Sequence, residues 1–252
     1  MENGALSPDR IARIRAGLRQ WFAENARDLP WRRTRDPYAI LVSEVMLQQT
    51  QVDRVLPYYE RFLQRFSTVA ALAAAPTAEV IRLWSGLGYN RRAVNLQRAA
   101  RAVVDEHGGE FPADPVTLRT LPGIGAYTAG AVAAFAFERD VAFLDTNMRR
   151  VVNRVVFGAD PAPEAKVLEA AQALVPPGEG WAWNQALIEF GALLCTARRP
   201  ACVVCPLQAE CAAYPVVQTV LAAKAKATRP NAPAPFEQTT RYFRGRIVEA
   251  LR

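Results

Sequence analysis

All four cysteines of this 252-residue chain lie in one short segment. They are Cys195, Cys202, Cys205 and Cys211, spaced C-x6-C-x2-C-x5-C. Four thiolates on one loop can enclose a tetrahedral zinc ion or an iron–sulfur cluster, and the spacing alone does not separate the two. Two disulfides are the alternative, but disulfides serve mainly small secreted domains, and we expect no leader peptide here because residues 1–15 mix charges throughout. The segment therefore predicts a metal-centred loop.

The rest of the chain has the pattern of an all-α protein. Ala, Leu and Arg dominate, β-branched runs are short, and Pro or Gly recurs every 10 to 25 residues. Residues 216–236 are predicted as a linker, and a last short helix is predicted over 240–251. Before the cysteine loop, helices are predicted over residues 9–26, 38–49, 51–66, 68–74, 77–85, 89–106, 115–120, 126–137, 146–157, 164–174 and 181–194.

Charge and hydropathy narrow the class of protein. The net charge of +7 is weak evidence for a nucleic-acid partner, because most of the excess follows Val216. Adjacent arginines such as Arg91 and Arg92 are more typical of a solvated helix face than of a phosphate clamp. The longest apolar run, about 129–137, is far shorter than the roughly 20 residues that a membrane span needs. We therefore expect a soluble, cytoplasmic protein with no membrane partner.

Leu121–Thr128 reads Leu-Pro-Gly-Ile-Gly-Ala-Tyr-Thr between two short helical patterns. Gly123 and Gly125 allow a tight turn, and the helix that follows would present free N–H groups at its N-terminus. Such an end binds phosphate through its amides and its dipole, and it positions DNA without reading sequence. An ordinary turn between two helices, capped by glycine, fits the same residues equally well.

Two acidic residues are candidate catalysts. Asp145 ends an apolar stretch and starts a helix, so it is predicted as an N-cap, where the helix end would keep its carboxylate ionised. An ionised carboxylate can stabilise the oxocarbenium-like state through which a glycosidic bond breaks. Glu44 has apolar helix neighbours and is either a surface residue or a desolvated acid with a raised pKa. Together they predict one ionised and one protonated carboxyl group.

Several segments together resemble the adenine DNA glycosylase (MutY) family of the helix-hairpin-helix, or endonuclease III, superfamily. They are S-E-V-M-L-Q-Q-T-Q-V, G-L-G-Y, the hairpin, L-D-T-N, A-L-I-E-F-G-A-L-L-C-T and the four-cysteine loop, from about Trp21 to Tyr214. The resemblance implies an all-α fold: a six-helix barrel with the helix-hairpin-helix (37–137) beside a [4Fe–4S] cluster helical domain (1–36 and 138–215). The active site would lie in the cleft between them, and residues 216–252 would form a basic linker and a short C-terminal helix.

The family removes adenine mispaired with guanine or 8-oxoguanine, so the resemblance implies a base-excision repair enzyme. It would act as a monomer on double-stranded DNA that contains a mismatch or lesion, in the cytoplasm at the nucleoid. Glu44 would protonate adenine at N7 and then help to activate water, Asp145 would stabilise the cationic sugar, and Tyr127 and Asn147 would support them. The four cysteines would hold a [4Fe–4S] cluster.

DNA contacts are implied in three segments. Gln49 and Tyr89 would wedge into the base stack, and Leu87 would read the opposite base. The full implied set is Gln48, Gln49, Thr50, Leu87, Gly88, Tyr89, Gly123, Gly125, Ala126 and Thr128.

Lysine is scarce in the chain and absent from the hairpin, occurring only at Lys166, Lys224 and Lys226. A glycosylase that nicks the strand needs an amine to form a Schiff base. Endonuclease III-like enzymes carry that lysine where this chain has Tyr127, so we expect base removal without strand cleavage.

The chain departs from the family at three places. Asn90 replaces the second aromatic residue of the usual G-L-G-Y-Y, and Thr146 replaces a common glycine. Because the sequence ends at Arg252, we expect a short form without the domain that inspects 8-oxoguanine, and a weaker preference for that base. Two alternatives remain: a G·T/G·U mismatch thymine or uracil glycosylase on the same scaffold, and a non-catalytic cluster-bearing DNA-binding protein.

Overall fold

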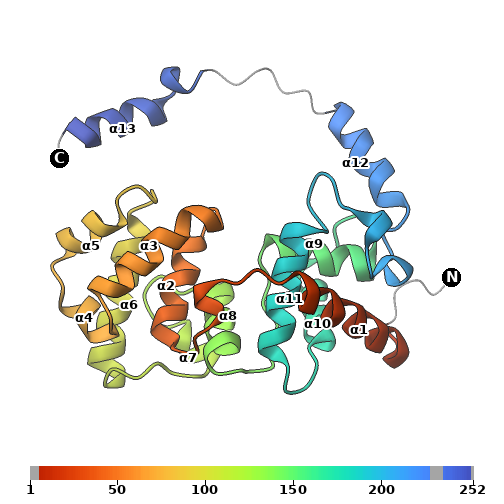
Figure 1. Cartoon of the computed structure of the whole chain (residues 1–252), viewed down its shortest axis with the longest axis horizontal. Helices are drawn as coiled ribbons and strands as arrows, with labels where there is room; N and C mark the ends of the chain where they lie inside the picture. Colours follow the sequence, from red (N-terminus) through yellow and green to blue (C-terminus); the bar gives the residue numbers. More distant parts are fainter. Residues whose placement is uncertain (1–5, 228–234, 251–252) are drawn as a thin grey trace.

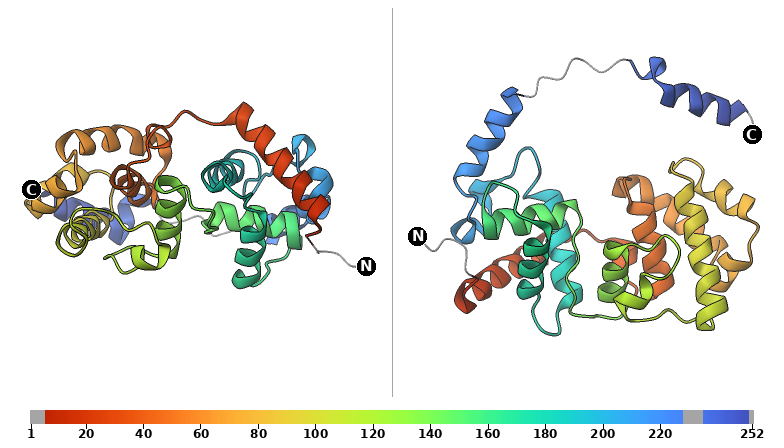
Figure 2. Two further views of the ribbon diagram at one scale, coloured as in Figure 1. Left: turned by 90° about the horizontal axis from the view of Figure 1, so that it is seen from below. Right: turned by 180° about the vertical axis from the view of Figure 1, so that it is seen from behind.

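The computed structural model describes residues 6–227 and 235–250, and these residues form helices and loops with no strand. Two groups of helices lie side by side (Figures 1 and 2). One group contains α2 (Pro37–Leu47), α3 (Val52–Arg65), α4 (Val69–Ala74), α5 (Thr77–Trp84), α6 (Arg91–His107), α7 (Pro115–Leu118) and α8 (Ala126–Ala136). The other contains α1 (Pro8–Asn25), α9 (Thr146–Val152), α10 (Glu164–Leu174), α11 (Gly180–Leu193) and α12 (Val216–Ala227). The protein is therefore all-α, as predicted.

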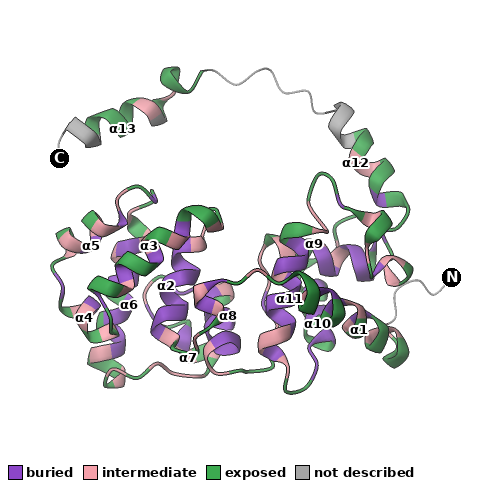
Figure 3. Cartoon of the chain, viewed as in Figure 1, coloured by how far each residue is buried: buried purple, intermediate pink, exposed green. Residues whose placement is uncertain are grey.

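The centre of the first group is α2, which packs against α8. Every residue of α2 from Tyr38 to Met46 is buried, as expected for a helix that is apolar on all sides. Asp36 starts the helix by accepting hydrogen bonds from the backbone N–H groups of Tyr38 and Ala39, and Pro37 occupies its first turn. Figure 3 shows burial concentrated in the central helices, whereas α13 (Thr240–Ala250) is mostly exposed. This core fixes the helix that carries Glu44.

The predicted helices before the cysteine loop all form, and each begins and ends within two residues of its predicted bounds. The last turns of the helix that starts at Thr146 are a π-helix, Asn153–Phe157. The helix predicted over 240–251 is described as α13, and its last predicted residue lies outside the described residues.

The linker predicted over 216–236 is wrong in its first half, because Val216–Ala227 is helical. Ala, Leu, Gln and Lys in this segment are strong helix formers, and the first proline after Pro215 is Pro230. Residues 228–234 lie outside the described residues. The predicted domain limits, 1–36 with 138–215, 37–137 and 216–252, stay a prediction. The two groups of helices follow the first two of these domains up to α11, whereas α12 lies in the range 216–252. No helix among the described residues is long and apolar enough to cross a membrane.

Candidate active site

Residues from both groups of helices line one cavity of about 820 Å³. The first group contributes Glu44, Tyr127 and the segment 47–52. The second contributes the segment 144–147 and residues of α11. The two candidate carboxylates, about 100 residues apart in sequence, thus face the same space.

Glu44 is a buried acid, with 5% of its surface exposed on α2. Its pKa is raised to about 7: burial has the largest effect, a hydrogen bond with Tyr127 opposes the rise, and the nearby charge of Asp145 adds to it. The predicted desolvation is therefore found, and the reading of Glu44 as a surface residue is excluded. A carboxyl group with a pKa raised toward neutral pH can both donate and accept a proton during a reaction.

Asp145 is the N-cap of α9, as predicted. One carboxylate oxygen accepts from the backbone N–H of Met148 at 2.6 Å, and the other accepts from the side-chain amide of Asn147 at 3.3 Å. Burial nevertheless raises the pKa of Asp145, and these hydrogen bonds with the charge of Arg150 only offset part of the effect. Loss of water therefore has the largest effect on the pKa of Asp145, and the hydrogen bonds at the helix end oppose it. That this carboxylate is ionised stays a prediction.

Tyr127 stands in the second position of α8 and reaches Glu44 across the cavity. Its ring packs edge-on against Phe143, with centroids 5.4 Å apart. Burial and the charges of Glu44 and Asp145 raise the pKa of the Tyr127 phenol well above its ordinary value. The hydroxyl therefore keeps its proton and can act as a hydrogen-bond donor to Glu44.

Asn147 contacts α11 and Arg150, which fix its position. Arg150 Nη2 donates to Asn147 Oδ1 at 2.8 Å and to the carbonyl of Gly191 at 2.6 Å, and its Nε donates to the carbonyl of Cys195 at 2.8 Å. A Cβ at Gly191 would lie 2.8 Å from Asn147 Cβ, so only glycine allows this approach. This packing orients the Asn147 amide toward Asp145.

The sequence analysis missed a buried ion pair on the wall of the same cavity. Glu189 of α11 is fully buried; Arg27 donates to it at 2.7 Å and Arg32 at 3.0 Å. These hydrogen bonds hold the pKa of Glu189 down at about 2 in spite of its burial. Trp31 and Gln185 line the cavity too. The signal was available, because Glu189 stands among apolar residues of a helix just as Glu44 does.

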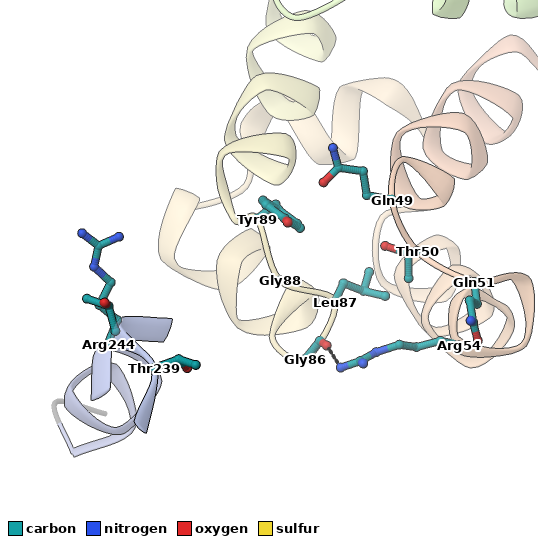
Figure 4. Close-up of a pocket in the computed structure, with 11 residues that line it drawn as sticks. Gln49, Thr50, Gln51, Arg54, Gly86, Leu87, Gly88, Tyr89, Thr239 and Arg244 are labelled. Carbon is teal, nitrogen blue, oxygen red and sulfur yellow. Dashed lines mark hydrogen bonds between the residues drawn. The ribbon is translucent and has the colours of Figure 1, made fainter. Parts of the chain in front are cut away.

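The two loops predicted to contact DNA line a second cavity, of about 1010 Å³, together with residues of α13 (Figure 4). Gln49 is exposed, and 57% of the Tyr89 surface is exposed. Both have a positive φ, 56° and 49°. Leu87 is 6% exposed and packs in the core, so it would have to move to read the opposite base, and that role stays a prediction.

The hairpin has the predicted turn. Gly123 has φ 78°, and a Cβ there would lie 2.7 Å from Asn95 Cβ. Gly125 is the N-cap of α8 with no side-chain cap, and Gly125 and Ala126 are exposed, so the first amides of α8 have no side-chain competitor. Thr128, which is predicted to contact DNA, is only 3% exposed, so its hydroxyl is not at the surface and a contact would have to use its backbone.

None of the four cysteines forms a disulfide, and all four are half-buried, so the structure does not support the disulfide alternative. Arg154, 8% exposed, places Nη1 3.5 Å from Cys195 Sγ and donates to the carbonyl of Thr196 at 2.7 Å. A buried cation beside these sulfurs fits a group that carries negative charge. No three His, Cys, Asp or Glu side chains in the described part are placed around a single metal ion. A four-iron cluster is larger than a single ion and holds its four thiolates farther apart.

Comparisons with known proteins agree with this geometry. The model of the HhH-GPD superfamily of base excision DNA repair proteins matches residues 42–177, and that of the iron–sulfur binding domain of endonuclease III matches 195–211. The fold, the cleft and the cysteine loop define a member of this superfamily that holds a [4Fe–4S] cluster. A solved thermostable thymine-DNA glycosylase is similar over 82% of this chain and 97% of its own, with TM-score 0.77 and 31% identity.

Relatives narrow the class. An adenine DNA glycosylase of Mycolicibacterium smegmatis is 49% identical over 75% of this chain and 66% of its own length. One of Mycobacterium tuberculosis is 42% identical over 93% and 77%, and one of Mus musculus is 45% identical over 82% and 43%. This chain belongs to the adenine DNA glycosylase family. It spans less than half of the mouse relative and about two thirds of the M. smegmatis relative.

Proposed function

We propose that this protein hydrolyses the N-glycosidic bond of adenine mispaired with guanine or 8-oxoguanine in double-stranded DNA and leaves the strand intact. One observation carries the proposal: Glu44 and Asp145, from different groups of helices, face one cavity, and burial raises the pKa of both. A hydrolase that must protonate a leaving base and stabilise a sugar cation needs two carboxyl groups in this relation.

In the proposed reaction, neutral Glu44 donates its proton to N7 of adenine, which weakens the bond to the sugar. The C–N bond breaks, the electron pair leaves with the base, and positive charge develops on the sugar. The Asp145 carboxylate, held by Met148 N–H and by Asn147, stabilises that charge. Glu44, now ionised, accepts a proton from the attacking water, so it returns to its starting state. Tyr127 holds Glu44 in place through its hydroxyl.

The same site supports the proposal that the enzyme does not cleave the strand. Tyr127 offers no amine, and the described lysine side chain, Lys166, is exposed on α10. A Schiff base with the sugar would need an amine at the cavity. The proposed enzyme is therefore monofunctional.

The proposed DNA path joins three surfaces. Gln49 and Tyr89 would enter the base stack beside the target, since both are exposed at loop tips. The first amides of α8, at Gly125 and Ala126, would bind a backbone phosphate. Base flipping follows because the target atoms are unreachable inside a stacked duplex. We further propose a monomer that acts at the nucleoid, in the cytoplasm.

Cys195, Cys202, Cys205 and Cys211 would hold the [4Fe–4S] cluster, which when bound supplies a rigid cross-link for the loop and a redox-capable centre that hydrolysis does not require. The loop is already fixed to α1, because Arg13 Nε lies 2.5 Å from Glu210 Oε1 and Arg10 Nη2 donates to the Glu210 carbonyl at 2.8 Å.

Single-turnover excision tests the proposal. Duplexes that differ only in one pair, A·8-oxoguanine, A·G, T·G, U·G or A·T, are incubated with the cluster-loaded protein and analysed with and without alkali. We expect loss of adenine from the first two, with strand breaks only after alkali. Release of thymine or uracil would instead support the alternative that the similar thymine-DNA glycosylase structure raises.

The variant Asp145→Asn separates an enzyme from a binding protein. We expect it to lose excision and keep its affinity for the mismatched duplex, since the amide cannot stabilise the sugar cation. If wild type releases no base from any duplex, the protein is a cluster-bearing DNA-binding protein and the proposed reaction fails.

A further inference from the structure

The loops that carry Gln49 and Tyr89 are both held in an uncommon backbone conformation. Three non-glycine residues of the described chain have a positive φ, and two of them are Gln49 and Tyr89. L residues rarely adopt this conformation unless the surrounding structure imposes it. Some contact must therefore hold the two loops, 48–51 and 86–89, in place.

That contact is Arg92, at the start of α6. Its Nη1 donates to the carbonyls of Val45 at 3.0 Å, Met46 at 2.9 Å and Gln48 at 2.5 Å. These are carbonyls from the last turn of α2 and its C-cap, where no backbone N–H of the helix is left to bond them. The guanidinium thus caps the helix that carries Glu44 and fixes the chain just before Gln49.

The other nitrogen of the same guanidinium holds the second loop. Arg92 Nη2 donates to the carbonyls of Leu87 at 3.2 Å and Gly88 at 3.1 Å, and to Thr50 Oγ1 at 3.2 Å. The guanidinium carbon also lies 5.7 Å from the centre of the Tyr89 ring. One planar side chain therefore bonds both loops at once, and Figure 4 shows Gln49 and Tyr89 projecting from the two loops beside their shared cavity.

Arg92 is not the solvated residue that the sequence analysis expected. Burial lowers its pKa, and carbonyls of the two loops accept from its two terminal nitrogens, whereas its Nε is buried without a partner. No single point charge such as a lysine ammonium can reproduce two nitrogens that face two loops, because the guanidinium fork is planar and rigid.

We propose that Arg92 is a positioning residue that locks the loops 48–51 and 86–89 into one unit, so that Gln49 and Tyr89 enter the base stack together. The inference rests on the proposed function, since the two residues act as a wedge only in an enzyme that opens a base pair. It extends that function by naming the residue that couples the two parts of the wedge.

The test compares Arg92→Lys with Arg98→Lys, a control that keeps the charge and replaces an exposed arginine of the same helix. Backbone hydrogen exchange of the DNA-free protein comes first. We expect Arg92→Lys to raise exchange in residues 47–51 and 85–90 together, and Arg98→Lys to change neither. Faster exchange in only one loop, or in neither, would overturn the proposed coupling.

Two assays then measure the effect on function: base unstacking on binding, and excision of adenine from two duplexes. With 2-aminopurine beside the target adenine, and in a Glu44→Gln background without chemistry, the fluorescence rise on binding should be lost with Arg92→Lys. Excision from an A·G duplex should fall about 10- to 100-fold, but less than about 3-fold when the adenine faces an abasic site and is already unpaired. Equal losses on both substrates would indicate a general structural role and contradict the inference.

A second variant and the exchange measurement distinguish failure of the Arg92 inference from misfolding and from failure of the proposed function. If Arg92→Lys does not fold, Thr50→Val removes one acceptor of the guanidinium and should show the same pattern with a smaller loss, about 3-fold. If wild type releases no adenine, the proposed function fails, whereas hydrogen exchange still decides whether Arg92 couples the loops.

Discussion

Replacing Glu44 by Gln tests the central claim that this carboxyl group is held neutral by its surroundings. Glutamine has the shape of the protonated acid but cannot ionise. Burial raises the pKa of Glu44 from its ordinary 4.5 to about 7. A folded-state pKa above the unfolded value means that the folded protein binds the proton more tightly. Wild type therefore loses stability as the pH rises above the unfolded value, and the loss levels off above pH 7.

The expected size follows from the linkage relation. At about 1.4 kcal/mol per pH unit, the full effect is about 3 kcal/mol, and about 2 kcal/mol of it falls between roughly pH 5.5 and pH 8. Urea unfolding of the cluster-loaded protein, followed by circular dichroism at both pH values, measures it. The stability of Glu44→Gln relative to wild type should rise by about 2 kcal/mol across this range. Glu60→Gln, an exposed carboxylate of α3, serves as the control. A difference that does not change with pH would refute the buried-acid argument.

Three more predictions follow from the same site. The single-turnover excision rate of wild type should fall about tenfold per pH unit above about pH 7, because only protonated Glu44 can donate, and a flat profile would exclude it as the acid. Glu189→Gln should lower stability by about 3–5 kcal/mol in urea titrations, since it leaves two arginines without a buried partner; a loss below about 1 kcal/mol would mean that the pair is solvated. Gly191→Ala should push Asn147 out of place and slow excision about 10- to 100-fold with duplex affinity kept; unchanged excision would show that α9 moves freely.

Local patterns predicted the helices and most of the candidate residues. Helix propensity and proline or glycine punctuation are properties of neighbouring residues, so they placed the helix ends within two residues up to the cysteine loop. The same local view failed at Val216–Ala227, where a tail with a proline-rich end was taken as a linker throughout. Prolines that follow a helix do not prevent it from forming, because they interrupt only their own part of the chain.

Residue types and their neighbours in the sequence also predicted part of the chemistry of the site. A glutamate among apolar neighbours pointed to a raised pKa at Glu44, and the aspartate before a helix pointed to a cap at Asp145. The rise in the Asp145 pKa was not predicted, because it depends on how much water the surrounding helices exclude. Burial is a sum over contacts distant in sequence, and no local pattern contains it.

The sequence by itself therefore determined which residues can carry the chemistry: the four thiols, the two carboxyl groups and a hairpin with bare amides. Only the tertiary structure decided how they combine. It brought Glu44 and Asp145 to one cavity from different groups of helices, and it buried Glu189 against two arginines. It also placed Arg92, which the sequence predicts on a solvated helix face, between two loops that it bonds at once. The physical reason is that pKa values, ion pairs and shared hydrogen bonds depend on distance and burial in space, which packing sets.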